Sequence, residues 1–442
     1  MIKKESLFTS IVISALIYMF FMWGALSVQL KVFPYGLMER SLIGMSALFY
    51  NVLDPDPALT VSGYNRPIFK EYYGRSGVTH ATDSAEEFYV LYSNSADHIV
   101  RLIDRTGQEL HRWDTDPIGK LKKPNYILQD IQSQSIETRD VVLQENGDLL
   151  VVFEVINQFH NNYGVVKYNK DSDVVWYHQG RNHHYLDVAP NGDIYTLSLD
   201  VLTGRFPYDS LKQIHPPSFE DYIEVLGDDG ALKKRVSIIG AINNSQYGPV
   251  FLETLYNSNG KGDYLHPNTA YYITKNDALS SPLFKEGQVL VSLRNVDTIV
   301  AIDLEKEQAV WLSKGPWVGQ HDSKLMNDGR IALFDNMGAQ ALKKSRILSF
   351  DMLKNDYRVL YEGNEKHPFY SPFCSAFEIL ESGNIFIVSH HNGRMFEVRE
   401  NGEIIWEYFI PIDDPKDKNK SAGVYSGKRY LHADLPFLFE KE

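Results

Sequence analysis

The most regular feature of the chain is a short polar turn with a central glycine, followed by a run of apolar residues. Leu149–Phe153 and Ile385–Val388 are two such runs. The five turns are Asn146-Gly147-Asp148, Asn191-Gly192-Asp193, Glu286-Gly287-Gln288, Asp328-Gly329-Arg330 and Ser382-Gly383-Asn384. Glycine supplies the positive φ angle that a tight hairpin turn requires. The pattern therefore predicts a series of β-hairpins.

A second element recurs with the first: a short strand, a polar turn, and a strand that carries a large residue. The large residues are Trp113, Trp176, Val236, Trp311, Tyr361 and Trp406. Six such units of about four strands each are typical of a β-propeller. We therefore predict an all-β fold, a six-bladed β-propeller over residues 85–442. The large residues should pack between blades, and Tyr430–Phe439 should give the first blade a strand that closes the ring. After residue 60, only residues 127–136 and 219–223 have a helical pattern.

The N-terminus predicts a membrane anchor. No charged residue occurs from Ser6 to Leu30, and Lys3 and Lys4 precede this stretch. About 20 apolar residues span a bilayer, and basic residues stay in the cytoplasm. We thus expect a transmembrane helix within residues 1–32 as a signal-anchor. A juxtamembrane linker would follow over residues 33–84, with the propeller on the extracytoplasmic, periplasmic side. Residues 31–50 have the pattern of a second, less apolar helix, which we expect along the membrane surface. The alternative is a signal peptide cleaved near Ala25-Leu26-Ser27.

The net charge limits the kinds of partner that the protein can bind, and the cysteine content limits its disulfide chemistry. The formal net charge is −13, and such a surface repels phosphate backbones, so nucleic acid is not an expected partner. Cys374 is the single cysteine, which excludes an internal disulfide. Its thiol is either a nucleophile or a small buried hydrophobe. The sequence lacks P-loop, GxSxG and CxxC motifs.

Candidate chemistry lies on the first strand of each blade, because these strands line the central channel of a propeller. Counting back eight residues from Gly147, Gly192, Gly329 and Gly383 gives Arg139, His184, His321 and Ser375. His266 begins the corresponding strand of the fourth blade. Three histidines and an arginine should therefore converge. Histidine suits nucleophilic and acid–base catalysis near neutral pH, and arginine binds sulfate or carboxylate groups.

The same histidines allow a second interpretation, a metal site. Three imidazoles can bind Zn²⁺ or Mn²⁺ and leave a position open for water. However, His183-His184 and His390-His391 are adjacent pairs, and neighbouring residues of a strand face opposite sides. We therefore predict no metal ligands and no cofactor.

Several longer motifs resemble the arylsulfotransferase family. They are Gln320-His321-Asp322-Ser323-Lys324-Leu325 with Asp335-Asn336, Asp263 with His266 and Asn268, and Asn392-Gly393-Arg394-Met395-Phe396-Glu397. The resemblance covers roughly residues 85–436. It implies a bacterial, extracytoplasmic propeller that moves a sulfuryl group from a phenolic sulfate ester to a phenol without a nucleotide donor. It also implies small-molecule aryl sulfate and phenol partners, and a sulfated histidine intermediate held by other histidines and an arginine.

Carried over residue by residue, the resemblance gives a candidate site. His266 and His321 match the family's motif histidines. Met337-Gly338-Ala339-Gln340 stands where the family has an arginine, and Arg346 is the nearest substitute. The family's nucleophilic histidine has Ser375 at its channel position, with His390 and His391 at the far end of that strand. The predicted catalytic residues are His266, His321, His184 and His391, and the predicted substrate-binding residues are Arg139, Arg346, Asn268 and Ser375.

Two alternatives to a sulfotransferase remain open from the sequence. One is a non-catalytic, membrane-anchored propeller that binds a ligand or a protein. The other is a metal-dependent enzyme on the same scaffold. The sequence does not decide which histidine is the nucleophile.

Overall fold

The computed structural model describes residues 4–30, 66–67, 69–82, 86–128, 130–156, 158, 161–211, 214, 218–249, 251, 255, 262–411 and 420–439. The chain divides into two units, Met1–Pro57 and Ala58–Glu442. In the first unit, α1 runs from Lys4 to Leu30. Across the described part of the chain, no helix combines the length and the hydrophobicity that crossing a membrane requires. The predicted transmembrane helix is therefore not confirmed, and the predicted surface stretch at 31–50 lies outside the described residues.

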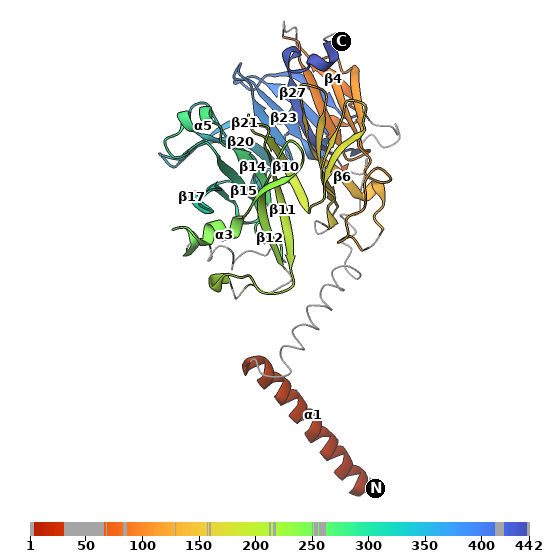
Figure 1. The fold of residues 1–442 in the computed structure, drawn as a ribbon, viewed down its shortest axis with the longest axis vertical. Helices are drawn as coiled ribbons and strands as arrows, with labels where there is room; N and C mark the ends of the chain where they lie inside the picture. Colours follow the sequence, from red (N-terminus) through yellow and green to blue (C-terminus); the bar gives the residue numbers. More distant parts are fainter. Residues whose placement is uncertain are drawn as a thin grey trace. The chain divides into compact units, whose positions relative to one another are not determined.

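The second unit contains six sheets whose four successive strands form the blades of a β-propeller (Figure 1). The first strands are β27 (Val424–Tyr430), β6 (Ile136–Leu143), β10 (Asn182–Val188), β14 (Pro267–Tyr272), β18 (His321–Leu325) and β22 (Ala376–Ile379). The second strands are β3 (Tyr89–Asn94), β7 (Leu149–Val155), β11 (Ile194–Leu202), β15 (Gln288–Leu293), β19 (Ile331–Ala339) and β23 (Ile385–Ser389). The predicted six-bladed fold is confirmed.

The outer half of each blade follows the same order. The third strands are β4 (Ile99–Asp104), β8 (Gly164–Tyr168), β12 (Ser218–Leu226), β16 (Thr298–Asp303), β20 (Lys344–Asp351) and β24 (Arg394–Val398). The fourth strands are β5 (Glu109–Asp114), β9 (Val174–His178), β13 (Leu232–Ser237), β17 (Gln308–Lys314), β21 (Asp356–Glu362) and β25 (Ile404–Phe409). Residues 219–223, which have a helical pattern in the sequence, lie in strand β12, because its neighbours β11 and β13 satisfy its backbone.

The glycine turns and the large residues have the predicted roles. Gly147, Gly192, Gly287, Gly329 and Gly383 all have positive φ angles and stand between the first and second strands of their blades. The six large residues all lie on fourth strands. Three of the indoles donate hydrogen bonds to the next blade: Trp113 to the Gly147 carbonyl at 3.2 Å, Trp176 to the Asp228 carbonyl at 2.8 Å and Trp406 to the Arg105 carbonyl at 2.9 Å. Turn and tryptophan together thus join neighbouring blades.

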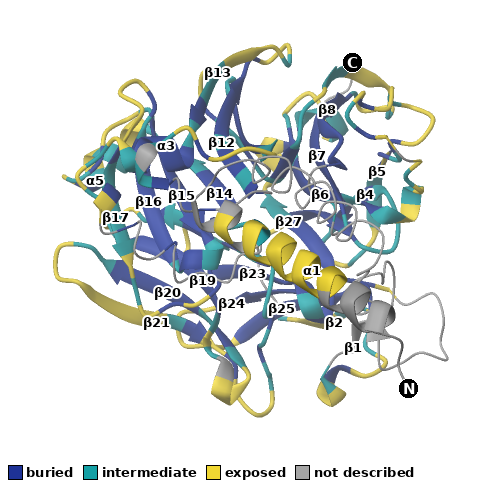
Figure 2. Ribbon diagram, turned by 90° about the horizontal axis from the view of Figure 1, so that it is seen from below, coloured by how far each residue is buried: buried dark blue, intermediate teal, exposed yellow. Residues whose placement is uncertain are grey.

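The hydrophobic core is divided among the interfaces between blades. One cluster, for example, joins Val100 and Trp113 of the first blade to Val141 and Val151 of the second. Five further clusters occupy the other blade interfaces. In Figure 2 the strands are mostly buried around the ring, while the hairpin turns at its rim are exposed. Burial between blades therefore fixes the first strands around the central channel.

The ring closes through the C-terminal segment. β27 pairs with β3, so a strand from the end of the chain completes the first blade. The closing strand ends at Tyr430, whereas Tyr430–Phe439 was predicted to form it; η8 (His432–Asp434) and α6 (Pro436–Phe439) occupy that segment instead. β27 reads Val-Tyr-Ser-Gly-Lys-Arg-Tyr, a pattern too polar to reveal a strand, because it lines a polar channel.

The remaining elements lie at the edges of the blades. β2 (Gly77–Ala81) adds a fifth strand to the last blade by pairing with β25, and β1 (Arg66–Pro67) pairs with β26 (Lys420–Ser421). The expected linker over residues 33–84 thus includes strands that pair with the propeller. The other helical elements in the described part of the chain are α3 (Ile238–Asn243), α5 (Lys275–Ser280), η1 (Lys70–Tyr72), η2 (Ser133–Ser135), η4 (Asp209–Leu211), η5 (Arg294–Val296), η6 (Gln340–Leu342) and η7 (His390–Asn392). Among the described residues of the predicted helical segment 127–136, only the single turn η2 is helical.

Candidate functional site

The first strands are irregular where they enter the channel. The register between first and second strands shifts in five of the six blades, at 138–140, 183–186, 267–269, 321–324 and 424–426. Several non-glycine residues there have positive φ angles: His184, His266, Asp322, Cys374 and Ser375. Bulges redirect side chains, and left-handed backbone at such residues is strained and concentrates at functional sites. These distortions direct polar side chains into the channel.

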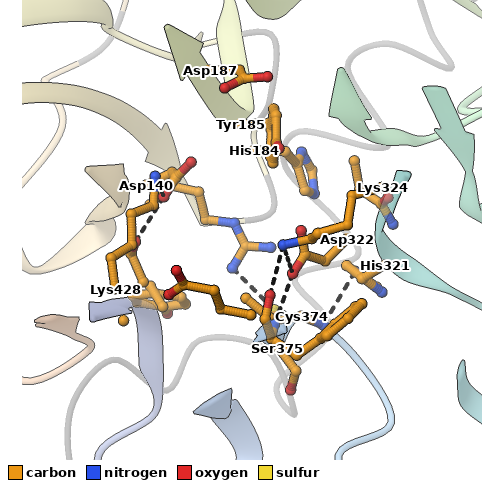
Figure 3. Close-up of a pocket in the computed structure, with 18 of the residues that line it drawn as sticks. Asp140, His184, Tyr185, Asp187, His321, Asp322, Lys324, Cys374, Ser375 and Lys428 are labelled. Atoms are coloured by element: carbon orange, nitrogen blue, oxygen red, sulfur yellow. Dashed lines mark hydrogen bonds and ion pairs between the residues drawn. The ribbon is translucent and has the colours of Figure 1, made fainter. Parts of the chain in front are cut away.

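A cavity of about 380 Å³ lies in the channel between the first strands. The first strands of all six blades contribute to its wall, which includes Arg139, His184, Asn268, His321 and Ser375. Tyr425, Lys428 and their neighbours on β27 complete the wall. Figure 3 shows the labelled side chains of His184, His321, Cys374 and Ser375 around a common space. Four positions counted back from the glycine turns, together with Asn268, therefore do converge.

His321 is held in one tautomer by its neighbours. Its Nδ1 lies 2.8 Å from Asn336 Oδ1 and 3.0 Å from the Gly319 carbonyl oxygen. Asn336 donates its own amide hydrogens to the carbonyls of Ser371 and Cys374, which fixes the amide oxygen toward the histidine. Nδ1 therefore carries the proton, and Nε2 carries the lone pair. The Cys374 backbone N–H donates to Nε2 over 3.2 Å.

His184 belongs to a compact buried cluster. Its Nδ1 lies 3.0 Å from a carboxylate oxygen of Glu154 and 2.9 Å from Nδ1 of His183. The ring of His266 meets that of His184 edge-on with centroids 4.8 Å apart, and Asp263 accepts from His266 Nδ1 at 2.5 Å. A carboxylate therefore orients each of two neighbouring histidines.

The adjacent pair His183-His184 does not face opposite sides of its strand, as strand alternation predicted. The two Nδ1 atoms lie 2.9 Å apart. The physical reason is local: His184 has a φ of 61°, and the register breaks between His183 and Leu186. A left-handed residue in a bulge ends the alternation on which the prediction relied.

Arg139 links the two histidine regions. Its guanidinium is buried, donates from Nη1 to Cys374 Sγ at 3.0 Å, and lies with Nε 3.4 Å from Glu154. The Tyr425 ring packs against the guanidinium at 5.2 Å. Because Cys374 also contacts His321 through its backbone, the arginine and this histidine border the same small region of the cavity.

Burial sets the protonation of the site. Loss of hydration lowers the pKa of His321 well below its usual range, and the positive charge of Arg294 lowers it further. Burial likewise lowers the pKa of His184 well below its usual range, and Arg139 adds to the effect. Burial raises the pKa of two carboxyl groups in the cavity wall, Asp187 and Glu378. The site therefore combines neutral imidazoles with carboxyl groups that hold protons more readily than usual.

Three aspartates of the cavity wall also tie blades together. Asp140 accepts from the Leu186 N–H at 2.9 Å, Asp187 from the Tyr272 N–H at 2.8 Å and Asp322 from the Phe377 N–H at 2.7 Å. Each bond joins a first strand to the first strand of the next blade. These bonds give the three aspartates a structural role.

Comparison with known protein families gives a match over part of the chain. Residues 232–410 match the family model described as Arylsulfotransferase (ASST). The resemblance to the arylsulfotransferase family is confirmed over this range. The matched segment contains His266, Asn268, His321 and Ser375, whereas Arg139 lies outside it. No curated protein matches the chain.

Solved structures with a similar arrangement share little sequence. A protein of unknown function from Bacteroides caccae is 12% identical, with a TM-score of 0.48, over 78% of this chain and 99% of that chain. A catalytically inactive virginiamycin B lyase from Staphylococcus aureus with quinupristin is 12% identical, with a TM-score of 0.40, over 83% of this chain and 97% of that chain. Neither likeness bears on function.

Of the other residues predicted for the site, two line the cavity and one lies behind its wall. Asn268 lines the cavity and donates to the Gln320 carbonyl at 2.8 Å. Ser375 lines it too, and its hydroxyl donates to Ser371 Oγ at 2.8 Å. His266 is not among the wall residues and reaches the site through His184.

Arg346 and His391 are not brought to the cavity. Arg346, on the third strand β20, pairs with buried Asp335 through two of its nitrogens, so its position on the blade and its charge partner keep it from the channel. His391 follows the second strand β23, and its ring lies against Phe373 with centroids 5.8 Å apart. The structure thus gives neither residue the channel position that the family pattern suggested.

The sequence did not reveal three polar partners. Asp263 and Asn336 stand inside the motifs that resemble the arylsulfotransferase family, but no role was assigned to them. Glu154 interrupts the otherwise apolar second strand Leu-Leu-Val-Val-Phe-Glu-Val, where it is 3% exposed. A charged residue in a fully buried strand needs a partner, and this signal could have found it.

Proposed function

We propose that the protein transfers a sulfuryl group from a phenolic sulfate ester to a phenolic acceptor, with His321 as the nucleophile. The observation that supports this most is the meeting of a neutral, oriented His321 and the buried Arg139 guanidinium at one cavity. The arylsulfotransferase match over residues 232–410 supports the same class of reaction.

In the first step, Nε2 of His321 attacks the sulfur of the ester. The nitrogen–sulfur bond forms as the bond from sulfur to the aryl oxygen breaks, and the aryl oxygen leaves with the electron pair. Asn336 and the Gly319 carbonyl accept from Nδ1–H, and they stabilise the positive charge that the ring gains. The long contact from the Cys374 N–H to Nε2 is broken when the substrate enters.

Arg139 binds the sulfuryl oxygens in this proposal. A guanidinium donates several hydrogen bonds in a fixed plane, which suits an anionic group with three oxygens. Because Arg139 and His321 both contact Cys374, a sulfuryl group between them replaces the thiol as the partner of the arginine. A preorganised cation in a buried site stabilises developing charge without having to reorient.

The raised pKa values of Asp187 and Glu378 suit proton transfer. One of these carboxyl groups gives its proton to the departing phenolate. The resulting carboxylate then takes the proton of the acceptor phenol, whose oxygen attacks sulfur as the nitrogen–sulfur bond breaks and the electron pair returns to Nε2. Both half-reactions use the same group in opposite directions.

The test is intact mass spectrometry of the full chain mixed with 4-nitrophenyl sulfate. We expect a gain of one sulfuryl group and release of 4-nitrophenol, and both should be lost in His321→Ala. Added imidazole should restore nitrophenol release in that variant, which a merely structural defect would not allow. His80→Ala, on the exposed edge strand β2, is the matched control and should react normally.

Two results would contradict the proposal. Normal turnover by His321→Ala would exclude this histidine as the nucleophile. Saturable binding of aryl sulfate without adduct or nitrophenol would favour the alternative of a non-catalytic binding propeller.

The extracytoplasmic location belongs to the same proposal. Its support is the uncharged stretch from Ser6 to Leu30 behind Lys3 and Lys4. Cell fractionation, with protease treatment of intact spheroplasts, should find the propeller accessible from outside. Recovery of the full chain only in the cytoplasmic fraction would contradict it.

A further inference from the structure

Three possible metal-ligand atoms meet beside the channel cavity. One atom each from Glu154, His183 and His184 lie within 4.8 Å of one another, a grouping found among the described residues. Nδ1 of His184 is 2.9 Å from Nδ1 of His183 and 3.0 Å from the Glu154 carboxylate. Ligands bound tetrahedrally to Zn²⁺ at about 2.1 Å stand roughly 3.4 Å apart. The three atoms therefore surround a point that a small cation fits with little movement.

We propose that Glu154, His183 and His184 form a transition-metal site that prefers Zn²⁺. This inference does not rest on sulfuryl transfer. It also uses a different set of residues from the three channel histidines His184, His266 and His321, which the sequence offers as possible ligands. The bulge at His184 is what creates the new set, because it turns two adjacent imidazoles toward one carboxylate.

The surroundings of His183 give an independent indication. Its Nε2 is buried, makes no hydrogen bond of good geometry among the described residues, and lies 3.9 Å from the Asp221 carboxyl group. Oδ2 of Asp221 is likewise buried without a hydrogen-bond partner in the described part of the chain. Metal-bound histidines usually direct their second nitrogen at a carboxylate or a carbonyl. With Nδ1 on the metal, Nε2–H of His183 faces Asp221, whose Oδ1 is the nearer carboxyl oxygen.

The tautomer of His183 decides which nitrogen can bind the metal. A histidine binds metal only through an unprotonated nitrogen. A proton on Nε2, the atom that faces Asp221, leaves the lone pair of Nδ1 for the metal.

The ligand set selects the kind of ion. Two imidazoles and one carboxylate match zinc sites that keep a position open, and hard cations such as Mg²⁺ prefer oxygen ligands. His184 belongs to the cavity wall, so the open position can face the cavity. The charge of Arg139, 3.4 Å from the second oxygen of Glu154, weakens cation binding but orients the carboxylate.

The experiment is zinc titration of the full-length protein after chelator treatment, followed by calorimetry and elemental analysis. We expect one Zn²⁺ per chain, and Co²⁺ in its place should give visible absorption bands typical of a low-coordinate nitrogen and oxygen site. Glu154→Gln and His183→Gln should each weaken binding at least tenfold. Asp221→Asn should weaken it about tenfold, the usual effect of losing an outer-shell partner.

Two matched controls locate the site. His80→Ala removes an exposed histidine on β2 and should leave zinc binding unchanged. His321→Ala removes a buried histidine of the same cavity and should also retain the metal. Thermal unfolding without metal identifies any variant that fails to fold, and the Co²⁺ spectrum of the unmodified protein stands without variants.

Three outcomes would overturn the inference. They are no stoichiometric zinc, equal zinc binding in all variants, and loss of zinc in His321→Ala but not in Glu154→Gln. The last would point to the channel histidines instead. Because zinc is measured without substrate, loss of sulfuryl transfer alone leaves this inference intact.

Discussion

The first and second strands of each blade are neighbours in one sheet, yet they are built differently. The pairs between second and third strands keep their register in every blade except at Asp335–Ala339. The pairs between first and second strands shift in five of six blades. The second strands are largely apolar and buried, whereas the first strands carry histidines, aspartates and an arginine.

The difference shows where stability and chemistry are located. A regular strand between two others satisfies its backbone and packs both faces against neighbouring blades. The first strand has one sheet neighbour and one polar channel face, so it can hold bulges and left-handed residues that a middle strand could not. Such strain persists only where the surrounding structure enforces it. The second strands therefore supply the support, and the first strands supply the site.

We expect the largest loss of stability from a substitution on a second strand. Phe153 on β7 is fully buried in the cluster between the first two blades. Phe153→Ala should lower the free energy of unfolding by about 3–5 kcal/mol, because it removes apolar contacts and leaves a cavity. Denaturant titration measures this. Val175→Ala on the outer strand β9, where the side chain is 52% exposed, should change stability by less than about 0.5 kcal/mol. Similar costs at both sites would refute the comparison.

The same contrast explains how much of the fold could be predicted. Second and fourth strands have apolar runs, glycine turns and large residues, so a single sequence reveals them. First strands were located only indirectly, by counting back from a glycine such as Gly192 to His184. β27 has no glycine turn before its sheet partner and a polar pattern, and its position was therefore predicted several residues too late.

The candidate site was predictable only in part, for a similar reason. Arg139 and His321 occupy equivalent positions of the repeat, and equivalent positions converge in a ring. Glu154 lies on a second strand, and its contact with His184 depends on a bulge that no pattern in the sequence announces. Arg346 follows a family motif in sequence, but its blade position places it against Asp335.

We expect a loss of stability of intermediate size as the pH falls. The pKa of His183 is about 4 in the folded chain because of burial, against about 6.5 when unfolded. Between pH 4 and pH 6.5 the unfolded chain binds more protons than the folded chain. The contribution of neutral His183 to the free energy of unfolding is therefore complete above pH 6.5 and is lost as the pH falls toward 4. From pH 7 to pH 4.5 the unmodified chain should lose about 2.5 kcal/mol relative to His183→Asn. Urea titration with a chelator present tests this, and parallel pH profiles would contradict it.

The smallest expected effect on stability distinguishes two residues that both have a left-handed backbone conformation. Glu307 has a φ of 51° in the exposed turn between β16 and β17, and Ser375 has a φ of 80° beside the cavity. Glycine relieves left-handed strain but adds freedom to the unfolded chain. Glu307→Gly should therefore stabilise the protein by about 0.5 kcal/mol. Ser375→Gly should instead destabilise it by about 1 kcal/mol, because it removes the hydroxyl's hydrogen bonds with Ser371 Oγ and the His390 N–H.

Thermal and denaturant unfolding of the two variants, compared with the unmodified chain, measures both signs. Opposite signs would mean that the turn tolerates its strain, whereas the first strand is held in its strained form by the contacts of the site. If both variants stabilise the protein, then the hydroxyl of Ser375 does not hold the first strand, and its bonds to Ser371 and His390 add nothing to folding. The distinction between second strands, which support the fold, and first strands, which carry the site, would then rest on the bulges alone.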